Sequence, residues 1–146
     1  AGLIRARLAP ELGRVGTPEQ VDPTILTALW DAGAVPVVSP VSNGPQGEAV
    51  NVNADEAALA LALALRAESL VYLSDVDGVR TEVETLGALT AADAARLEAA
   101  GVITGGMAMK VRMALEAAGA GIPEVIVAGN YPAFRRISKQ CRGGTH

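Results

Sequence analysis

Short valine-rich runs alternate along this sequence with segments rich in alanine and leucine, and this alternation restricts the fold more than any other feature. The runs at residues 34–39, 69–74 and 124–130 have the length and composition of buried strands. The segments between them contain alanine and leucine, which are strong helix formers. Strands that alternate with helices are joined by right-handed crossovers into a parallel sheet covered on both faces. The sequence therefore predicts an α/β fold with a mostly parallel central sheet.

The composition agrees with such a fold and excludes several classes of protein. The 146 residues are enough for a single domain or for part of one, and only 3% of them are aromatic, so small aliphatic side chains build the core. A net charge of −4 provides no positive field that would attract nucleic acid. Cys141 is the only cysteine and His146 the only histidine, so neither an internal disulfide nor a thiolate metal site is expected.

The start of the sequence and its hydropathy bear on location. No apolar run reaches the roughly 18 to 20 residues that span a bilayer, and no signal segment opens the sequence, so we expect a cytoplasmic protein without a membrane partner. The sequence begins at Ala1 without a methionine and enters a segment rich in leucine and isoleucine. Such a beginning is more typical of the middle of a protein.

Local signals predict four helices. Asp22 and Pro23 begin the first, which Gly33 ends, and Thr90 with Asp93 forms a capping box for a helix that ends at Gly101. Residues 57–65 alternate like a strand, but they contain only alanine and leucine, and we therefore predict a buried helix that is apolar on all sides. The fourth helix is expected to start at about Met107. Between the first two helices, Asn43 and Gly44 predict a turn before an extended segment at 49–53.

Three polar clusters lie at predicted junctions between strands and helices, where α/β folds bind their ligands. The first contains Asn51, Asn53 and Asp55, which alternate with apolar residues and can share one face of an extended segment. One such residue would be enough to cap the following helix. From the residues alone, a helix cap and a ligand site are equally good interpretations.

The second and third clusters are each open to a simpler interpretation. Residues 74–78 (SDVDG) contain paired aspartates but lack the remaining ligand spacing of a calcium loop, so a polar turn is favoured. In the third cluster Thr104, Gly105 and Gly106 precede a helix that carries Lys110 within about its first turn. Glycine allows backbone amides to approach a phosphate, although the spacing is not that of a P-loop. A capped helix with a surface lysine would also explain it.

Taken together, the clusters indicate phosphoryl transfer. A lysine, exposed amides and a positioned carboxylate suit a reaction in which the protein mainly orients the reactants and neutralises charge. The segments AVPVVSPVS, NVNADEAA, LVYLSDVDGV and GVITGGMAMKV, in this order, resemble the amino acid kinase family and within it the acetylglutamate kinases. The resemblance covers nearly the whole chain, and NVNAD and GGMxxK are its specific parts.

The resemblance implies an αβα sandwich and transfer of the ATP γ-phosphoryl group, with Mg²⁺ carried by the nucleotide, to the side-chain carboxylate of N-acetyl-L-glutamate. It implies that Asn51 and Asn53 bind the amino acid, that Asp55 orients catalytic lysines and that Lys110 stabilises the transition state. Gly105 and Gly106 would lie near the phosphates. The other nucleotide-binding residues that it implies are Ser74, Asp75, Val76, Asp77, Gly78, Val79, Arg80, Val102, Ile103, Thr104 and Met107.

The chain also departs from the family pattern. The family's N-terminal half supplies a glycine-flanked lysine, a glycine-rich loop and an arginine, which have no counterpart here, so residues 1–146 resemble the ATP-binding C-terminal half. One alternative is a binding or regulatory module that keeps the nucleotide site without catalysis, and another is a kinase for a different carboxylate. Half of a doubly wound sheet exposes a strand edge, so we also expect self-association.

Overall fold

The computed structural model describes residues 2–74 and 90–129, which belong to two compact units. Unit 1 consists of residues 1–70 and 120–123, and unit 2 of residues 71–119 and 124–146. Each unit has its own hydrophobic core among the described residues. The turn predicted at 75–78 lies outside the described residues.

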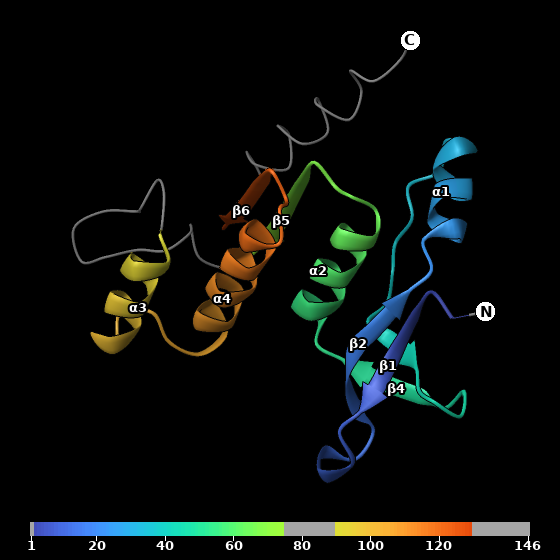
Figure 1. Cartoon of the computed structure of the whole chain (residues 1–146), viewed down its shortest axis with the longest axis horizontal. Coiled ribbons are helices and arrows are strands. Elements are labelled where there is room, and N and C mark those ends of the chain that lie inside the picture. The colour runs from blue at the N-terminus through green and yellow to red at the C-terminus, as the bar shows by residue number, and fades with distance from the viewer. Residues whose placement is uncertain (1, 75–89, 130–146) are drawn as a thin grey trace. The chain divides into compact units, whose positions relative to one another are not determined.

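Four strands of unit 1 close into a barrel in the order β1-β2-β4-β3 (Figure 1). Strand β1 (Ile4–Leu8) pairs antiparallel with β2 (Val15–Val21) across the short 3-10 helix η1 (Pro10–Leu12). Strand β3 (Val41–Asn43) pairs antiparallel with β4 (Ala49–Val52). Parallel pairings of β1 with β3 and of β2 with β4 close the barrel.

The β1-β2 hairpin was not among the predicted elements. In β1 Ile4 and Ala6 are buried whereas Arg5 and Arg7 are exposed, which is the period-two pattern of a strand with one buried face. The pairing register shifts between Arg5 and Ala6, so β2 contains one extra residue there. Alternation of arginine with apolar residues was the available signal for this strand.

Helix α2 (Ala54–Ala64) confirms the helix predicted from alanine and leucine composition. Its residue Ala57 joins Val50 and Val52 of β4 in the core of unit 1. The prediction that this helix is buried on all sides is wrong for Leu63, which is 40% exposed. An alanine-rich helix contacts its neighbours closely along one face, and the opposite face needs a further partner to be covered.

Helix α1 (Thr24–Asp31) starts one residue later than predicted, with Pro23 instead of Asp22 as its N-cap. The carboxylate of Asp22 still accepts a hydrogen bond from the Thr24 amide at 3.1 Å, from the residue just before the cap. Gly33 has a φ of +78°. The amides of Gly33 and Ala34 donate to the carbonyls of Trp30 and Leu29, which is a Schellman motif.

The strand predicted at residues 34–39 is wrong. These residues form no strand in the structure, and Val35 and Val37 are 87% and 96% exposed. A valine-rich run becomes a buried strand only when a neighbouring strand pairs with it, and none of the described residues does so. Pro36 also lacks the amide that a central strand needs.

The predicted turn after Asn43 is confirmed. The Gly44 amide donates to the Glu48 carbonyl at 2.8 Å, and the Gly47 amide donates back to the Gly44 carbonyl at 3.0 Å. This turn joins β3 to β4, and β4 confirms the predicted extended segment up to Val52. The predicted polar residues at 51 and 53 thus lie where the barrel leads into α2.

The described residues of unit 2 form two helices, one strand and most of a second strand, which starts at the end of unit 1. Strands β5 (Ser69–Leu73) and β6 (Glu124–Ala128) form a two-stranded sheet, which confirms both predicted strands. Helix α4 (Gly105–Gly119) packs on β6 and lies beside α3 (Ala91–Ala99) (Figure 1). The core residues of the two helices and the turn between them are Ala94, Leu97, Ile103, Ala108 and Val111.

The predicted capping box at the start of α3 is present. The Thr90 hydroxyl accepts a hydrogen bond from the Asp93 amide at 3.2 Å and donates to the Asp93 carboxylate at 2.6 Å. The hydrogen bond from the Thr90 hydroxyl, followed by those from the Arg96 guanidinium and the Thr90 amide, lowers the pKa of the Asp93 carboxyl. The helix ends at Ala99, and Gly101 follows with a φ of +71°.

The α/β class is confirmed, whereas the expected mostly parallel sheet is confirmed only in part. The described strands form a small barrel with mixed pairing and a separate pair, because the short connections within 4–21 and 41–52 force neighbouring strands to run antiparallel. Among the residues that the structure describes, no helix is both long and apolar enough to cross a membrane.

Candidate functional site

The junction between β4 and α2 carries the first polar cluster. Asn51 is exposed next to the end of β4, Asn53 is the N-cap of α2, and Asp55 is the second residue of that helix. The side-chain oxygen of Asn53 accepts hydrogen bonds from the amides of Asp55 at 2.9 Å and Glu56 at 3.3 Å. Asn53 is therefore a helix cap, and its side-chain NH₂ group is left to donate to another partner.

The alternation argument applies to only two of the three residues. Asn51 and Asn53 have extended backbone and are exposed on either side of the buried Val52, so they share a face. Asp55 lies in the first turn of a helix, where the period-two rule no longer holds. The chain changes from strand to helix at Asn53 because this cap satisfies the first helical amides.

Arg14, which directly precedes β2, and Gly16 of β2 hold this junction in place, and neither was among the predicted site residues. The Asn51 amide donates to the Arg14 carbonyl at 2.8 Å, and Gly16 pairs with Val52. A methyl group on Gly16 would press on the Arg7 carbonyl oxygen and lie 2.9 Å from a Val50 methyl group. An isolated glycine inside a strand pattern was the available signal, because it often marks a close approach of backbones.

The glycine pair forms the start of α4 instead of preceding it. Helix α4 starts at Gly105, two residues earlier than predicted, and the Ala108 amide donates to the Thr104 carbonyl at 3.3 Å. Gly105 has a φ of +54°, which is why glycine is favoured there. A methyl group built on Gly105 or Gly106 would meet no atom of the described residues within 4 Å. With respect to that part of the chain, the backbone of this turn is open to an incoming group.

Lys110 lies further along α4 than expected. It is the sixth residue of the helix and belongs to its second turn, because the glycine pair occupies the first. Its side chain is half-buried. Helical geometry places residues three and four positions apart on one face, so Lys110 shares a face with Gly106 and Met107.

The other nucleotide-binding residues predicted around this turn fall into two groups. Val102 and Thr104 are exposed, whereas Ile103 is only 2% exposed and belongs to the core of unit 2. Met107 packs against the same core. Any nucleotide contact of Ile103 must therefore come from its backbone, since its side chain is enclosed by other apolar groups.

The second polar cluster is described only at its first residue. Ser74 follows β5, and its amide donates to the Ala128 carbonyl of β6 at 2.8 Å. The remaining predicted residues lie outside the described part of the chain: Asp75, Val76, Asp77, Gly78, Val79 and Arg80.

An ion pair joins α4, which begins with the glycine pair, to α3. The Arg112 guanidinium of α4 donates to the Glu98 carboxylate of α3, and this hydrogen bond raises the pKa of Arg112. Both side chains are substantially exposed, so solvent screens their attraction. The pair connects the two helices, but it supplies no charge to Gly105 and Gly106 at the start of α4.

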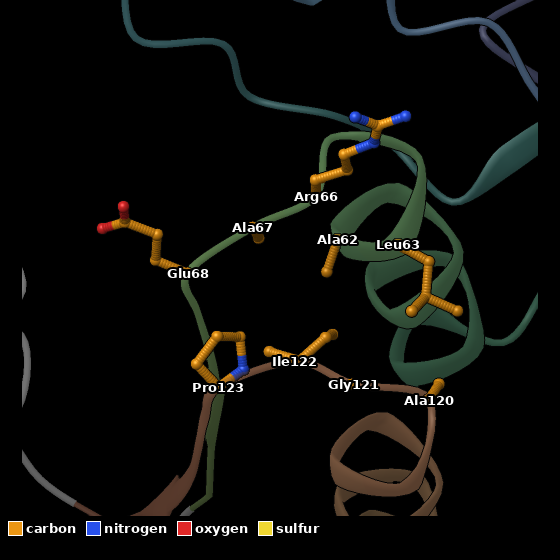
Figure 2. Close-up of a pocket in the computed structure, with 9 residues that line it drawn as sticks. All are labelled: Ala62, Leu63, Arg66, Ala67, Glu68, Ala120, Gly121, Ile122 and Pro123. Atoms are coloured by element: carbon orange, nitrogen blue, oxygen red, sulfur yellow. The ribbon is translucent and has the colours of Figure 1, made fainter.

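One pocket of unit 1 lies apart from all of these predicted residues. It has a volume of about 240 Å³ and lies between the end of α2 and residues 120–123. Figure 2 shows the charged ends of Arg66 and Glu68 directed away from Ile122 and Pro123. The walls that remain are aliphatic and suit neither phosphate nor carboxylate.

Comparison with known sequences decides the family. A sequence profile of the amino acid kinase family matches residues 1–129. The chain belongs to the amino acid kinase family. Membership confirms the family resemblance of the NVNAD and GGMxxK segments.

Relatives in the amino acid kinase family are similar to most of the chain. It is 49% identical over 127 residues to the acetylglutamate kinase of Rubrobacter xylanophilus, which covers 87% of this chain and 50% of that protein. It is 43% identical over 128 residues to the acetylglutamate kinase of Chlorobaculum tepidum, covering 86% of this chain and 45% of that protein. The chain thus spans about half the length of these relatives.

Solved structures agree with this family assignment. A protein of Streptococcus mutans UA159 superposes with a TM-score of 0.82 and 25% identity, covering 88% of this chain and 54% of that one. The N-acetylglutamate synthase of Neisseria gonorrhoeae, crystallised with coenzyme A and L-arginine, superposes with a TM-score of 0.74 and 25% identity. The match covers 88% of this chain and 31% of the synthase.

Proposed function

We propose that residues 1–146 form part of an acetylglutamate kinase, its ATP-binding lobe, which transfers the ATP γ-phosphoryl group to the side-chain carboxylate of N-acetyl-L-glutamate. The family and the names of the relatives supply the reaction and the substrate. We also propose that the protein works in the cytoplasm in arginine biosynthesis as a homo-oligomer. Each part of this proposal is open to a direct test.

The start of α4 is the structural observation that carries the proposal. The first amides of a helix have no partner within the helix and point out of its N-terminus, where the helix dipole favours an anion. Gly105 and Gly106 leave this end open, with no atom of the residues that the structure describes within 4 Å of where a side chain would begin. A phosphate group fits here, because glycine places no side chain of its own between the phosphate and the backbone N–H donors.

Lys110 and Mg²⁺ would supply the positive charge that balances the phosphates of ATP. We propose that Lys110 neutralises charge on the transferring phosphoryl group, as a lysine on a flexible stem can. The described residues contain no group of three or more carboxylate, histidine or cysteine side chains that could hold a metal ion. The magnesium is therefore proposed to arrive with the nucleotide, bound through its phosphates and water.

The β4–α2 junction would serve the amino acid. We propose that the side-chain amides of Asn51 and Asn53 donate to the acetyl or carboxylate oxygens of acetylglutamate, since both are exposed on one face. Asp55 is proposed to orient a catalytic lysine. Ser74, Val102, Thr104 and the backbone of Ile103 are proposed to contact the nucleotide, together with the predicted residues at 75–80.

A second candidate function is nucleotide binding without transfer, or transfer to another carboxylate. The open start of α4 at Gly105 and Gly106 suits the binding of a phosphate group whether or not transfer follows. ATP binding by calorimetry without any phosphoryl transfer to acetylglutamate would assign the chain to this second class.

The decisive experiment measures ATP binding by calorimetry and acetylglutamyl phosphate formation by hydroxamate trapping. We expect ATP to bind the chain. Lys110→Ala should weaken ATP binding about tenfold, because the variant lacks one positive charge directed at the phosphates. Arg112→Ala is the matched control, because it removes a positive charge from the same helix that is already engaged by Glu98. Unchanged ATP affinity in Lys110→Ala, or an equal loss in both variants, would contradict the proposed phosphate site.

A further inference from the structure

The turn between β3 and β4 begins with an asparagine followed by a glycine. Asn43 is the last residue of β3 and is exposed, and Gly44 is the next residue. An asparagine side chain can react with the backbone nitrogen of the residue after it, most readily before glycine, which has no side chain to obstruct the approach. Asn51 and Asn53 precede a valine and an alanine, whose side chains hinder the same reaction. Among the described residues, Asn43 is therefore the asparagine most open to this reaction.

The folded turn restrains the reaction at the attacking atom. The Gly44 amide donates to the Glu48 carbonyl at 2.8 Å, so its hydrogen is already engaged. The Gln46 amide donates to the Glu48 carboxylate at 2.8 Å, and the Gly47 amide donates back to the Gly44 carbonyl at 3.0 Å. The Gly44 nitrogen must lose its hydrogen before it can attack, so the reaction proceeds from a locally opened turn.

Asn43 is also the residue at which the barrel of unit 1 closes. Among the described residues, the parallel pairing of β1 with β3 consists of the pair Arg5 and Asn43. The Asn43 side chain lies against the backbone of Gly2, because a methyl group on Gly2 would come within 2.5 Å of the Asn43 Nδ2 atom. The other strand pairs of the barrel share more residues. A change in the backbone at Asn43 thus acts where the barrel is least firmly paired.

We propose that Asn43 is a site of spontaneous modification, at which deamidation to isoaspartate opens the barrel between β1 and β3. The Gly44 nitrogen gives up its proton and bonds to the Asn43 Cγ atom. The bond from Cγ to Nδ2 breaks, and the Nδ2 group leaves as ammonia with that proton. Water then adds to either carbonyl of the cyclic imide, which gives aspartate or isoaspartate.

The two products differ in their effect on unit 1. In isoaspartate the main chain runs through Cβ and Cγ, so β3 gains an additional backbone atom and loses its register with β1. In aspartate the main chain is unchanged. The new carboxylate then lies beside Arg5, which is exposed on the neighbouring strand, and an opposite charge there is compatible with the pairing. Isoaspartate is therefore the product that opens the barrel.

The test incubates the full chain at mildly alkaline pH, in native buffer and in urea. Peptide mapping by mass spectrometry locates the modified asparagine, and labelling by an isoaspartyl methyltransferase distinguishes isoaspartate from aspartate. We expect modification at Asn43 in both solvents, at least about tenfold faster in urea, because the turn protects the Gly44 nitrogen. Equal modification of Asn43, Asn51 and Asn53, no modification in native buffer, or a rate that urea leaves unchanged would overturn the proposal.

Variants assign the rate to the turn. Gly44→Ala should slow the reaction severalfold in urea, where only the added methyl group acts. Glu48→Ala removes the carboxylate that accepts the Gln46 amide, so it should speed the reaction in native buffer and leave the rate in urea unchanged. Glu68→Ala is the matched control, because it removes an exposed carboxylate outside the turn. Equal native rates in the two glutamate variants would contradict protection by the turn.

Stability measurements separate the two products. Asn43→Asp should unfold at nearly the same urea concentration as the parent chain, because its backbone is normal. Chain enriched in isoaspartate by incubation and ion exchange should unfold at lower urea and show faster amide hydrogen exchange in β1 and β3. Treatment with the methyltransferase, which returns isoaspartate to aspartate, should restore the midpoint. If the enriched chain is as stable as the parent, isoaspartate does not open the barrel and the inference is wrong.

Discussion

The side-chain oxygen of Asn53 accepts the backbone amide of Asp55 at 2.9 Å, so one predicted site residue fixes the backbone of another. Asn53→Ala should lower the free energy of unfolding by about 1 kcal/mol through loss of the cap. Asn53→Asp keeps an oxygen acceptor and should retain the stability, but it removes the NH₂ donors proposed to bind acetylglutamate. Urea unfolding and acetylglutamate titration separate the two effects.

Asn51→Asp provides the comparison for that series. No hydrogen bond of the Asn51 side chain caps α2, so Asn51→Asp should leave the stability unchanged while weakening acetylglutamate binding. If both aspartate variants bound acetylglutamate as the parent chain does, the two asparagines would be structural residues only.

Gly105→Ala should weaken ATP binding. A residue with a side chain at a φ of +54° is strained by roughly 1–2 kcal/mol, and the turn would relax away from the open geometry that a phosphate needs. Gly101→Ala is the matched control, because Gly101 has a φ of +71° and equally open surroundings but belongs to the end of α3. Both variants should lose similar stability in urea, and only Gly105→Ala should lose ATP affinity by calorimetry.

Stability should depend on pH through the capping box of α3. The pKa of Asp93 is lowered from 3.8 in the folded chain, so its contribution is complete above that value and is lost as the pH falls through the folded pKa. Thr90→Ala should cost about 1 kcal/mol at pH 7. This difference should shrink below pH 3.8, which urea unfolding across pH can measure. Asp93→Asn should remove this pH dependence, whereas the titration of Asp22 remains common to all variants.

Arg66→Gly should stabilise the chain. Arg66 follows α2 with a φ of 51°, and the amides of Arg66 and Ala67 close a Schellman motif where glycine is the usual residue. Glycine relieves the strain of the left-handed backbone, but it also adds conformational entropy to the unfolded chain. The net gain in the free energy of unfolding should be about 0.5 kcal/mol. Arg66→Ala retains the strain and should bring no gain. A higher midpoint for the alanine variant in thermal unfolding would assign the effect to the arginine side chain instead.

Elements with local signals were predictable from the sequence. The spacing of Thr90 and Asp93 predicted the start of α3, and Gly33 predicted the end of α1, because capping bonds depend on neighbouring residues only. The same reasoning left a helix cap and a ligand site equally open for Asn51, Asn53 and Asp55. Asn53 is the cap, and the predicted strand geometry extended two residues too far, to Asp55.

Elements that depend on distant partners were not predictable in this way. Residues 34–39 have strand composition, but pairing requires an edge that no described residue provides. The barrel arises from parallel pairings of β1 with β3 and β2 with β4, between residues that are far apart in the sequence. The buried side chain of Ile103 likewise follows from the packing of α3 against α4, which no sequence motif encodes.

The closed order of β1, β2, β4 and β3 limits where unit 1 can add a strand. A sheet that closes on itself has no terminal row of unpaired amides, and such rows are the templates for runaway association between chains. Among the described residues of unit 1, the exposed extended run at 34–39 is a place where such association can begin. Substitutions that make the chain insoluble by strand addition should therefore occur in these six residues more often than in the barrel. A charged residue placed among them should reduce aggregation.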